Sequence, residues 1–480
     1  MPRQAPEVPL ALGARRAGQT IISWLHEEVR AAILSGRLPR GARLPTTRDL
    51  AERHRVSRGV VVAAFEQLRE EGYVISRVGA GTTVAAQVAE DFLAIADAPV
   101  SPARRRGPAV RAVRPFCPIE PALDEFPMAT WARITSRVLG RLGVGALARG
   151  DAAGSRPLRE AVAGYLGASR GVACSPDHVV ILSGVQQGLD LIARLVVRPG
   201  EPVWIEDPGY SGAVEVFRNA RARVVPVRVD EDGLDPAVGR RRCARPAAVY
   251  LTPAHQFCLG SPLSPARRAD LLRWAKEAGT TLIEDDYDSE FRYRGAPLPA
   301  MRGLAGGESI FMLGTFNKVL FPSLRLGYMV APDAWVDRVL ALRYQTDLYP
   351  PAISQAVLTS FIEGGHFARH LRRMRERYGT RLGVLQREVA RHLEGAVRLP
   401  DIHAGLSTPA FLSRRISARV VAARGIEHGL DLWTLDRFAL LRRDLRGFLL
   451  GFAAFGERQI RDGVVALRRA IEESIRRGST

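Results

Sequence analysis

Lysine is almost absent from this chain, so each lysine is a candidate for chemistry that arginine cannot perform. Lysine and arginine together number 69, yet Lys276 and Lys318 are the only lysines. A guanidinium stays protonated in proteins, whereas a lysine amine can lose its proton and attack a carbonyl carbon. Lys276 lies in the amphipathic stretch LLRWAKEAG, where chance explains it. Lys318 is therefore the candidate nucleophile, to be judged by its neighbours.

Polar side chains follow several short apolar runs, at the points where buried strands would end. The run VVIL is followed by residues 183–187, SGVQQ, which open a helix whose first N–H groups can hold an anion. Tyr210 follows VWIE, Asp285 follows TLIE, and Lys318 and Arg325 follow SIFML. Each feature alone is also typical of a structural cap or a solvated turn. Together they form the set that pyridoxal 5′-phosphate (PLP) requires, with an amine, an acid for its ring nitrogen and donors for its phosphate.

Apolar strands and helical stretches alternate over the larger, C-terminal part of the chain. VVILSG precedes the helical pattern QQGLDLIARLVV, and AAVYLTP precedes ARRADLLRWAKEAG. This alternation predicts an α/β fold with a mainly parallel sheet and flanking helices. Ligands of such sheets bind at the carboxyl ends of the strands. The polar residues named above are therefore expected in one site.

The N-terminal part has a different pattern, typical of a winged helix-turn-helix. Residues 19–36 carry apolar side chains at helical spacing. Thr46 and Ser57 are predicted N-caps of two further short helices, and Gly72 ends the second of these. The following YVISRV, a GAG turn and TTVAA indicate a small β-hairpin. In such a fold the second helix of the pair lies in the major groove of double-stranded DNA.

Length and composition limit the remaining possibilities. A chain of 480 residues with 46% hydrophobic residues is long enough for two or three folded domains. We predict a DNA-binding domain over 15–84, a linker over 85–115 and an α/β domain over 116–480. The formal charge of +19 favours a polyanionic partner only weakly, because the basic residues are spread along the chain. Scattered cysteines, no membrane-length apolar run and no convincing signal peptide predict a cytoplasmic protein without a metal site.

The N-terminal pattern closely resembles the GntR-type DNA-binding domain. The matching blocks are LPTTRDLA, VSRGVVVAAFEQLREEG and GAGTTV. Gly59 and Val60 depart from the polar residue and threonine that the family prefers, so the base-reading code is not predicted. The resemblance implies that the residues meeting DNA are Thr46, Thr47, Arg48, Ser57, Arg58 and Arg77.

From about residue 116 onward the chain resembles the fold-type I PLP-dependent transferases, and as a whole it is similar to the MocR family of transcription regulators. The blocks that carry this resemblance include GSRPLREAVAGYL, EDPGY, TPAHQF, EDDYDSEFRY and GTFNKVLFPSLRLGY. It implies a Schiff base on Lys318, Asp285 at the pyridine nitrogen and Tyr287 at the 3′-oxygen. His255 and Gln256 belong near the ring. The resemblance further implies that the phosphate and the remaining cofactor contacts are provided by Val185, Gln186, Tyr210, Thr315, Asn317 and Arg325.

Several positions depart from the family pattern. Asn317 stands where a phosphate-binding serine is usual, and its amide can still donate. Arg149 stands where this fold commonly has a tyrosine that reaches the neighbouring subunit's phosphate. Leu449 stands where aminotransferases often carry an arginine for the substrate carboxylate, with Arg446 slightly upstream. Gly212 lies near a position where GABA-responsive members use arginine. These departures leave open whether a carboxylate is bound.

Three functions follow from this pattern. The first is a transcription regulator that senses PLP, or a small amine effector, through an aldimine at Lys318. The alternative is a catalytically active aminotransferase with an appended DNA-binding domain, which the missing arginine makes less favourable. The last is a PLP-free scaffold, which the intact set of lysine, aspartate, tyrosine and arginine argues against. The resemblance also implies a head-to-tail homodimer that places two DNA-binding domains on two half-sites.

Overall fold

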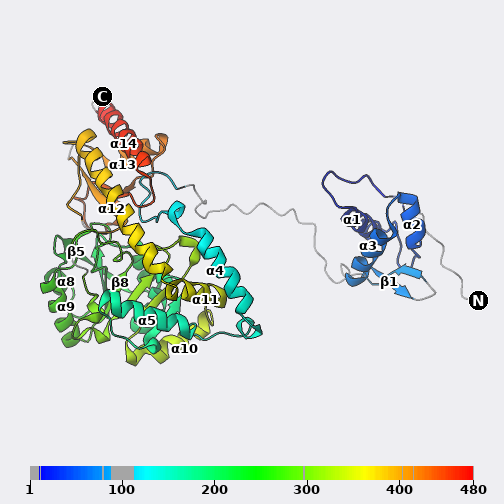
Figure 1. The fold of residues 1–480 in the computed structure, drawn as a ribbon, viewed down its shortest axis with the longest axis horizontal. Helices are drawn as coiled ribbons and strands as arrows, with labels where there is room; N and C mark the ends of the chain where they lie inside the picture. The colour runs from blue at the N-terminus through cyan, green and yellow to red at the C-terminus, as the bar shows by residue number, and fades with distance from the viewer. Residues whose placement is uncertain are drawn as a thin grey trace, which may run out of the picture. The chain divides into compact units, whose positions relative to one another are not determined.

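The computed structural model describes residues 10, 12–77, 81–87, 113–295, 298–402, 404–413 and 416–478. The chain divides into two compact units, Met1–Ala109 and Val110–Thr480 (Figure 1). The predicted linker over 85–115 stays a prediction, because residues 88–112 lie outside the described residues. Each unit is therefore considered by itself.

The N-terminal unit consists of three helices and a two-stranded antiparallel hairpin around a single apolar cluster. Leu25 and Val29 of the first helix meet Val61 and Leu68 of the third in that cluster. This is the predicted winged helix-turn-helix. Its elements are α1 (Ile21–Leu34), α2 (Thr47–His54), α3 (Arg58–Glu70), β1 (Val74–Arg77) and β2 (Gly81–Val84).

Side-chain caps fix where the helices of the N-terminal unit begin, as their spacing predicts. Thr46 Oγ1 accepts from Asp49 N at 3.2 Å and donates to Asp49 Oδ2 at 2.6 Å. Ser57 Oγ accepts from Val60 N at 3.4 Å at the start of α3. Each cap satisfies an N–H group that has no carbonyl one turn back. The first turns of α2 and α3 are thereby each closed by a side-chain cap.

The C-terminal unit is built on an eight-stranded sheet of order β3-β10-β9-β8-β7-β4-β5-β6. Strands β9, β8, β7, β4 and β5 are parallel, while β10 runs antiparallel to both of its neighbours and β6 forms a short antiparallel edge. The mainly parallel sheet confirms the predicted α/β fold. The strands are β3 (Val179–Leu182), β4 (Pro202–Asp207), β5 (Arg223–Asp230), β6 (Gly233–Leu234), β7 (Ala248–Leu251), β8 (Thr281–Asp286), β9 (Phe311–Thr315) and β10 (Gly327–Val330).

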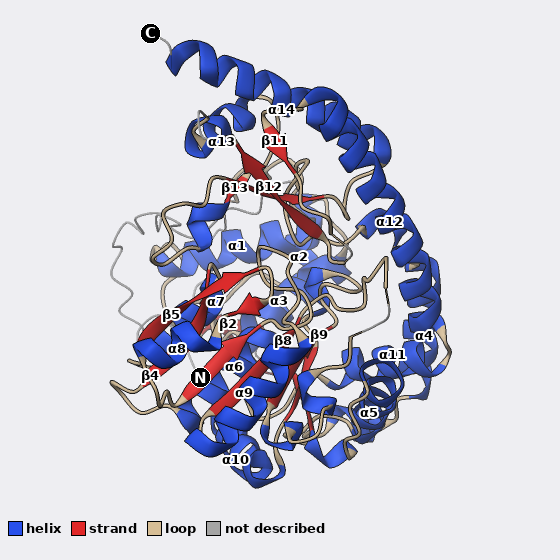
Figure 2. Cartoon of the chain, turned by 90° about the vertical axis from the view of Figure 1, so that its left-hand side faces the viewer, coloured by secondary structure: helices blue, strands red, loops and turns tan. Residues whose placement is uncertain are grey.

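Helices pack around this sheet, and a second, smaller sheet lies beyond its carboxyl edge, in the upper part of Figure 2. The smaller sheet has the order β11-β12-β14-β13. Its strands are β11 (Val397–Arg398), β12 (Ser407–Leu412), β13 (Trp433–Thr434) and β14 (Gly447–Gly451). The helices of the unit are α4 (Met128–Arg141), α5 (Arg156–Arg170), α6 (Val185–Val196), α7 (Ser211–Asn219), α8 (Pro236–Arg242), α9 (Pro265–Ala278), α10 (Val336–Thr346), α11 (Ala352–Glu363), α12 (His366–His392), α13 (Ala418–Glu427) and α14 (Glu457–Gly478).

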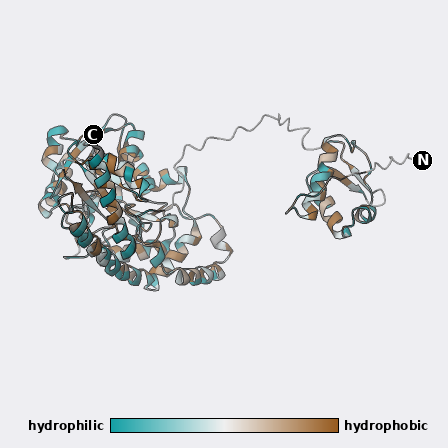
Figure 3. Cartoon of the chain, turned by 90° about the horizontal axis from the view of Figure 1, so that it is seen from above, coloured by the Kyte–Doolittle hydropathy of each residue, from teal (hydrophilic) through white to brown (hydrophobic). Residues whose placement is uncertain are grey.

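Hydropathy alternates along the helices of the C-terminal unit, with hydrophilic and hydrophobic residues on different faces (Figure 3). Strands β3, β7 and β9 of the large sheet are buried throughout, as expected for a parallel sheet covered on both faces, whereas β5 near its edge is partly exposed. No described helix is both long and apolar enough to cross a membrane.

Candidate cofactor and DNA-binding sites

The start of helix α6 forms one end of the candidate site. Its N-cap, Gly184, has a φ of 128°, a conformation that glycine adopts without strain. The first N–H groups of the helix, including those of Val185 and Gln186, have no carbonyl one turn back to bond. A Cβ built on Gly184 would lie 3.4 Å from Arg325 Nη1 and 3.4 Å from Asn317 Nδ2. A guanidinium and an amide therefore face the positive end of a helix, which suits a phosphate group.

The loop after β9 orients the Asn317 amide toward this helix start. Asn317 N donates to Thr315 Oγ1 at 3.1 Å, and Leu326 N donates to Asn317 Oδ1 at 3.0 Å. Because Oδ1 already accepts a hydrogen bond, Nδ2 is the atom that faces Gly184. The Thr315 hydroxyl accepts from the backbone and keeps its own proton for a further acceptor.

Asp285, at the end of β8, presents an unpaired carboxylate oxygen. Its Oδ2 accepts from the Tyr250 hydroxyl at 2.6 Å. Its Oδ1 is buried and has no hydrogen-bond partner in the described part of the chain. Burial raises the pKa of Asp285 to about 7, although the Tyr250 hydrogen bond acts in the opposite direction. A buried acceptor without a donor is costly, and a protonated pyridine nitrogen would supply that donor.

The adjacent Asp286 has a structural role instead. Successive side chains of a strand point to opposite faces of the sheet. Asp286 Oδ2 accordingly accepts from Arg170 Nε at 2.7 Å on the other side, and both side chains are almost fully buried. Of the two carboxylates, only Asp285 faces the candidate site.

Lys318 lies partly buried in the turn that follows β9. Burial lowers the pKa of its amine, and Glu120 and Cys117 partly offset that effect. Its side chain makes no hydrogen bond with any of the described residues. The lowered pKa increases the fraction of neutral amine, which is the form that attacks a carbonyl carbon.

Tyr287 and His255 form a small polar cluster after the end of β8. The Tyr287 hydroxyl lies 3.1 Å from His255 Nδ1, which also lies 3.1 Å from both carboxylate oxygens of Asp288. Asp288 in turn accepts from Leu406 N at 3.3 Å. The cluster therefore holds Tyr287 between the end of β8 and the smaller sheet. Its predicted role at the cofactor's 3′-oxygen stays a prediction.

Tyr210 stands between the two ends of the site. Burial raises its pKa to about 12, with Asp285 acting in the same direction and Arg325 against it. Its ring packs edge-on against Phe257, with the centroids 5.7 Å apart. A Cβ built on Gly212 would lie 2.4 Å from the Tyr210 ring. Gly212 therefore provides the space that this ring occupies.

The Gln186 side chain makes a contact within the protein. Its Nε2 donates to the Gly212 carbonyl at 3.3 Å, and the residue is exposed. The phosphate contact of Gln186, through its backbone or its amide N–H, stays a prediction. Gln256 donates from Nε2 to the Pro208 carbonyl at 2.8 Å, which anchors the loop over the site rather than contacting a ring.

The departures from the family pattern lie as follows. Leu449 is buried in β14, opposite Pro409 and Trp433. Arg446 is exposed just before that strand, and Arg149 is exposed on the segment after α4. At this position of β14 the chain therefore has a buried apolar side chain, whereas Arg446 and Arg149 are exposed to solvent.

The predicted DNA-contacting residues lie at the starts of α2 and α3 and at the end of β1. Thr46, Arg48, Ser57 and Arg58 are exposed, and Arg58 Nε donates to Thr47 Oγ1 at 3.4 Å, so the two helix starts are in contact. Arg77 is exposed. Arg43 forms a backbone bridge with Thr83 of β2, and its side chain lies close to Gly81.

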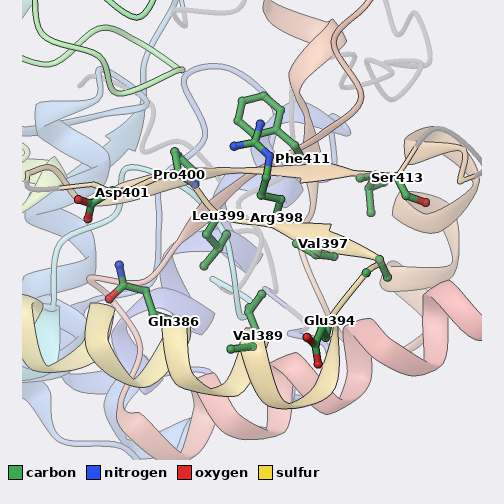
Figure 4. Close-up of a pocket in the computed structure, with 14 residues that line it drawn as sticks. Gln386, Val389, Glu394, Val397, Arg398, Leu399, Pro400, Asp401, Phe411 and Ser413 are labelled. Carbon is green, nitrogen blue, oxygen red and sulfur yellow. The ribbon is translucent and has the colours of Figure 1, made fainter.

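A separate cavity of about 810 Å³ lies between α12 and strands β11 and β12 (Figure 4). Gln386 and Val389 come from the helix, Glu394 follows its end, and the Arg398 guanidinium lies 4.8 Å from the centre of the Phe411 ring. None of the described residues that line it is a predicted site residue. It is not the candidate cofactor site.

Comparison with known proteins identifies both parts of the chain. Residues 23–84 match the family "Bacterial regulatory proteins, gntR family", and residues 143–404 match "Aminotransferase class I and II". A probable rhizopine catabolism regulatory protein, MocR, of Rhizobium meliloti is 36% identical over 93% of this chain and 92% of its own length. The chain belongs to the MocR family of transcription regulators.

Further relatives agree with this MocR-type organisation. A pyridoxine biosynthesis transcriptional regulator, PdxR, of Corynebacterium glutamicum is 31% identical over 79% of this chain and 81% of its own length. An α-aminoadipate aminotransferase from Thermus thermophilus, solved with N-(5′-phosphopyridoxyl)-L-leucine, has a TM-score of 0.70 at 28% identity and covers 76% of this chain and 93% of that one. The chain is thus a DNA-binding, PLP-dependent transcription regulator.

The residues of this MocR-type chain fit PLP. The Gly184 cradle with Arg325 and Asn317 matches a phosphate, and the unpaired Asp285 Oδ1 matches a protonated ring nitrogen. When bound, PLP supplies an aldehyde carbon that condenses with a primary amine. Lys318 would provide this primary amine, because burial lowers its pKa and so favours the neutral form.

Sequence reasoning missed two groups that belong to this site. Tyr250 is buried within β7, where nothing distinguishes it from the apolar residues around it, yet it holds Asp285. Glu120 precedes α4 by several residues and acts electrostatically on Lys318. The sequence feature that could have indicated Glu120 is an acid within the apolar and proline-rich stretch PFCPIEPAL, residues 115–123.

Proposed function

We propose that this regulator senses PLP and a small amine effector at Lys318, and that the occupancy of this site changes its affinity for DNA. In the exchange, the effector nitrogen would replace Lys318 Nζ on the carbon that was the PLP aldehyde. The neutral effector amine would lose two protons, and Lys318 Nζ would gain two. The proposal assigns 15–84 to DNA binding and 116–480 to cofactor binding and dimerisation.

The observation that carries this proposal is the combination of an intact PLP cradle with an exposed helix-turn-helix. A lysine whose pKa is lowered by burial, an unpaired buried carboxylate oxygen and a guanidinium facing a helix start serve one ligand. The DNA-facing residues around Ser57 and Arg58 would serve no purpose in a metabolic aminotransferase. Phosphate contacts from exposed arginines provide affinity for DNA, and the N-terminal residues of α3 provide base contacts.

A link between the site and the rest of the unit supports the sensing step. Asp207, at the end of β4, accepts from the backbone N–H groups of Leu440 and Leu441 at 2.8 and 2.9 Å. Asp288 reaches Leu406 in the same way. Both contacts join the large sheet to the segments of the smaller sheet. Ligand exchange at Lys318 can therefore bias the packing of the two sheets, provided that the ligand binds the two arrangements with different affinity.

We further propose a homodimer formed through the aminotransferase-like unit. Large apolar side chains are exposed on α4, on the residues that follow it, and at and after the end of α10, namely Met128, Leu139, Val144, Tyr344 and Leu348. Burial of such side chains against a second copy would remove apolar surface from water. A dimer would carry two DNA-binding domains and read two half-sites.

The test uses the full-length protein and DNA fragments selected from a random library. We expect PLP to give a visible absorbance band that survives dialysis in the wild type and is lost in Lys318→Ala. We expect PLP, or PLP with an amine, to change the DNA dissociation constant by at least about fivefold. An unchanged dissociation constant in every condition would refute sensing, and the absence of a band in the wild type would refute Lys318 as the attachment point.

A further inference from the structure

The turn that opens helix α6 is closed by the side chain of Gln187. Gln187 Oε1 accepts from Ser183 N at 2.8 Å, and Gln187 N donates to the Gly184 carbonyl at 3.2 Å. Both bonds lie within the turn 183–187, which also contains the N–H groups predicted to hold the PLP phosphate. The placement of this one amide therefore affects the placement of those donors.

The other end of the Gln187 amide is held by Asp347. Gln187 Nε2 donates to Asp347 Oδ2 at 2.6 Å, across 160 positions of the chain. Asp347 is the C-terminal cap of α10. An amide whose nitrogen donates to a carboxylate must direct its oxygen elsewhere, because only the oxygen can accept a hydrogen bond. Asp347 thus determines that Oε1, and not Nε2, meets the Ser183 N–H group.

Asp347 is in turn held by Arg343, one turn earlier on α10. Arg343 Nε lies 3.3 Å from Asp347 Oδ1, and Arg343 Nη2 donates to Asp347 Oδ2 at 3.3 Å. Nη1 of the same guanidinium donates to the Ile181 carbonyl in β3. Strand β3 leads into the turn and α6 leads out of it. The ion pair therefore contacts the chain both before and after the predicted phosphate donors.

The burial of Arg343 makes this arrangement dependent on charge. The Arg343 side chain is 0% exposed, whereas that of Asp347 is 35% exposed. A buried guanidinium without a partner is strongly destabilising, so Arg343 keeps the Asp347 carboxylate at the end of α10. Among the described residues, Asp347 is the only side chain that hydrogen bonds with the Gln187 amide. Removal of Asp347 would therefore free this amide to turn.

We propose that Asp347 is a positioning residue for the phosphate of PLP. Through the Gln187 amide, it holds the turn 183–187 in the shape in which the N–H groups converge on the phosphate, as backbone donors must to bind an anion. This inference rests on the proposed function, because it assumes that PLP is the ligand bound at Lys318.

Pyridoxal, which differs from PLP only in lacking the phosphate, separates this role from a purely structural one. The dissociation constants of PLP and pyridoxal are measured by titration of the visible band, with full-length protein prepared without PLP. We define the phosphate preference as the constant for pyridoxal divided by the constant for PLP. A substitution that merely loosens the fold weakens the binding of both ligands and leaves this quotient unchanged. Pyridoxal forms a cyclic hemiacetal in solution, which lowers its apparent affinity equally for every variant.

Asp347→Ala should lower the phosphate preference at least about tenfold, the loss expected when one charge-assisted hydrogen bond to the phosphate is no longer made. The affinity for pyridoxal should stay close to the wild-type value. Asp337→Ala is the matched control, because it removes an exposed acid from the first turn of the same helix, and it should change neither constant. A wild-type phosphate preference in Asp347→Ala, or an equal loss for both ligands, would overturn the proposal.

Gln187→Ala tests whether Asp347 acts through this amide. The substitution removes the same contact from its other side and should lower the phosphate preference to a similar extent. When it is combined with Asp347→Ala, the two losses should not multiply, because residues that act through one contact are not additive. Losses that multiply would show that Asp347 acts by another route. If Asp347→Ala fails to fold, Gln187→Ala decides alone, because it removes the contact and leaves the buried ion pair intact.

Failure of this inference is distinguishable from failure of the proposed function. If the wild type gives no visible band with PLP, the ligand itself is wrong, and both proposals fall together. If the wild type gives the band and the phosphate preference is unchanged in both variants, only the role of Asp347 is refuted. The effect of PLP on DNA binding would then be unaffected.

Discussion

Two adjacent buried aspartates should respond in opposite directions when their charges are removed. Asp285 and Asp286 are neighbours on β8 and are similarly buried, at 4% and 5% exposure. Asp286 Oδ2 is paired with Arg170 Nε at 2.7 Å, whereas the only hydrogen-bond partner of the Asp285 side chain among the described residues is the neutral Tyr250 hydroxyl; Oδ1 of each carboxylate lacks a hydrogen bond there. In the absence of PLP, Asp285→Asn should therefore stabilise the protein at pH 8, and Asp286→Asn should destabilise it.

The magnitude follows from the pKa of Asp285. Burial raises this pKa to about 7 from an ordinary value of 3.8. A raised folded-state pKa means that stability is fully present below pH 3.8 and is lost as the pH rises toward 7. Because a pKa difference of one corresponds to about 1.4 kcal/mol, the ionised carboxylate costs up to roughly 4 kcal/mol above pH 7. The amide introduced by Asp285→Asn would keep the Tyr250 contact without this cost. In contrast, removing the charge of Asp286 leaves Arg170 buried and unpaired, at a cost of roughly 3–5 kcal/mol.

Urea unfolding of PLP-free protein at pH 5 and pH 8 provides the assay. We expect the advantage of Asp285→Asn over the wild type to be larger at pH 8, because most of it accumulates between about pH 4 and pH 7. The same variant should bind PLP far more weakly, since an amide cannot stabilise a protonated ring nitrogen. Equal destabilisation by both substitutions would refute the assignment of Asp285 as an unpaired site carboxylate.

Three further predictions concern the phosphate seat, the DNA contacts and the dimer. Arg325→Ala should weaken PLP binding about 10- to 100-fold in a visible-band titration, because a charged hydrogen-bond donor is lost; Arg218→Ala, on exposed α7, should not. Arg58→Ala should weaken DNA binding and lower the salt dependence by about one counterion, whereas Arg69→Ala at the far end of α3 should change neither. Val144→Asp, at a side chain 84% exposed, should shift the protein from dimer to monomer in sedimentation, while Ile426→Asp on α13, 56% exposed, should leave it dimeric.

Local patterns were sufficient for the elements and for the type of chemistry. The N-caps Thr46 and Ser57 and the alternation of apolar runs with helices are short-range signals, and the corresponding helices and the parallel sheet form where these signals stand. The scarcity of lysine singled out Lys318. These features depend on residue type and on spacing along the chain, and both can be read directly from a sequence.

Tertiary structure decided which of the similar residues serve the site. Local pattern treats Asp285 and Asp286 alike, and only the family resemblance singles out Asp285. The structure gives the physical difference, because the two side chains emerge on opposite faces of β8, where one meets Tyr250 and the other Arg170. Tyr250 and Glu120 come from segments far apart in the chain, and the tertiary structure brings the first to Asp285 and the second close to Lys318. Burial and charge at a point in space depend on every segment that meets there, so no local pattern could give them.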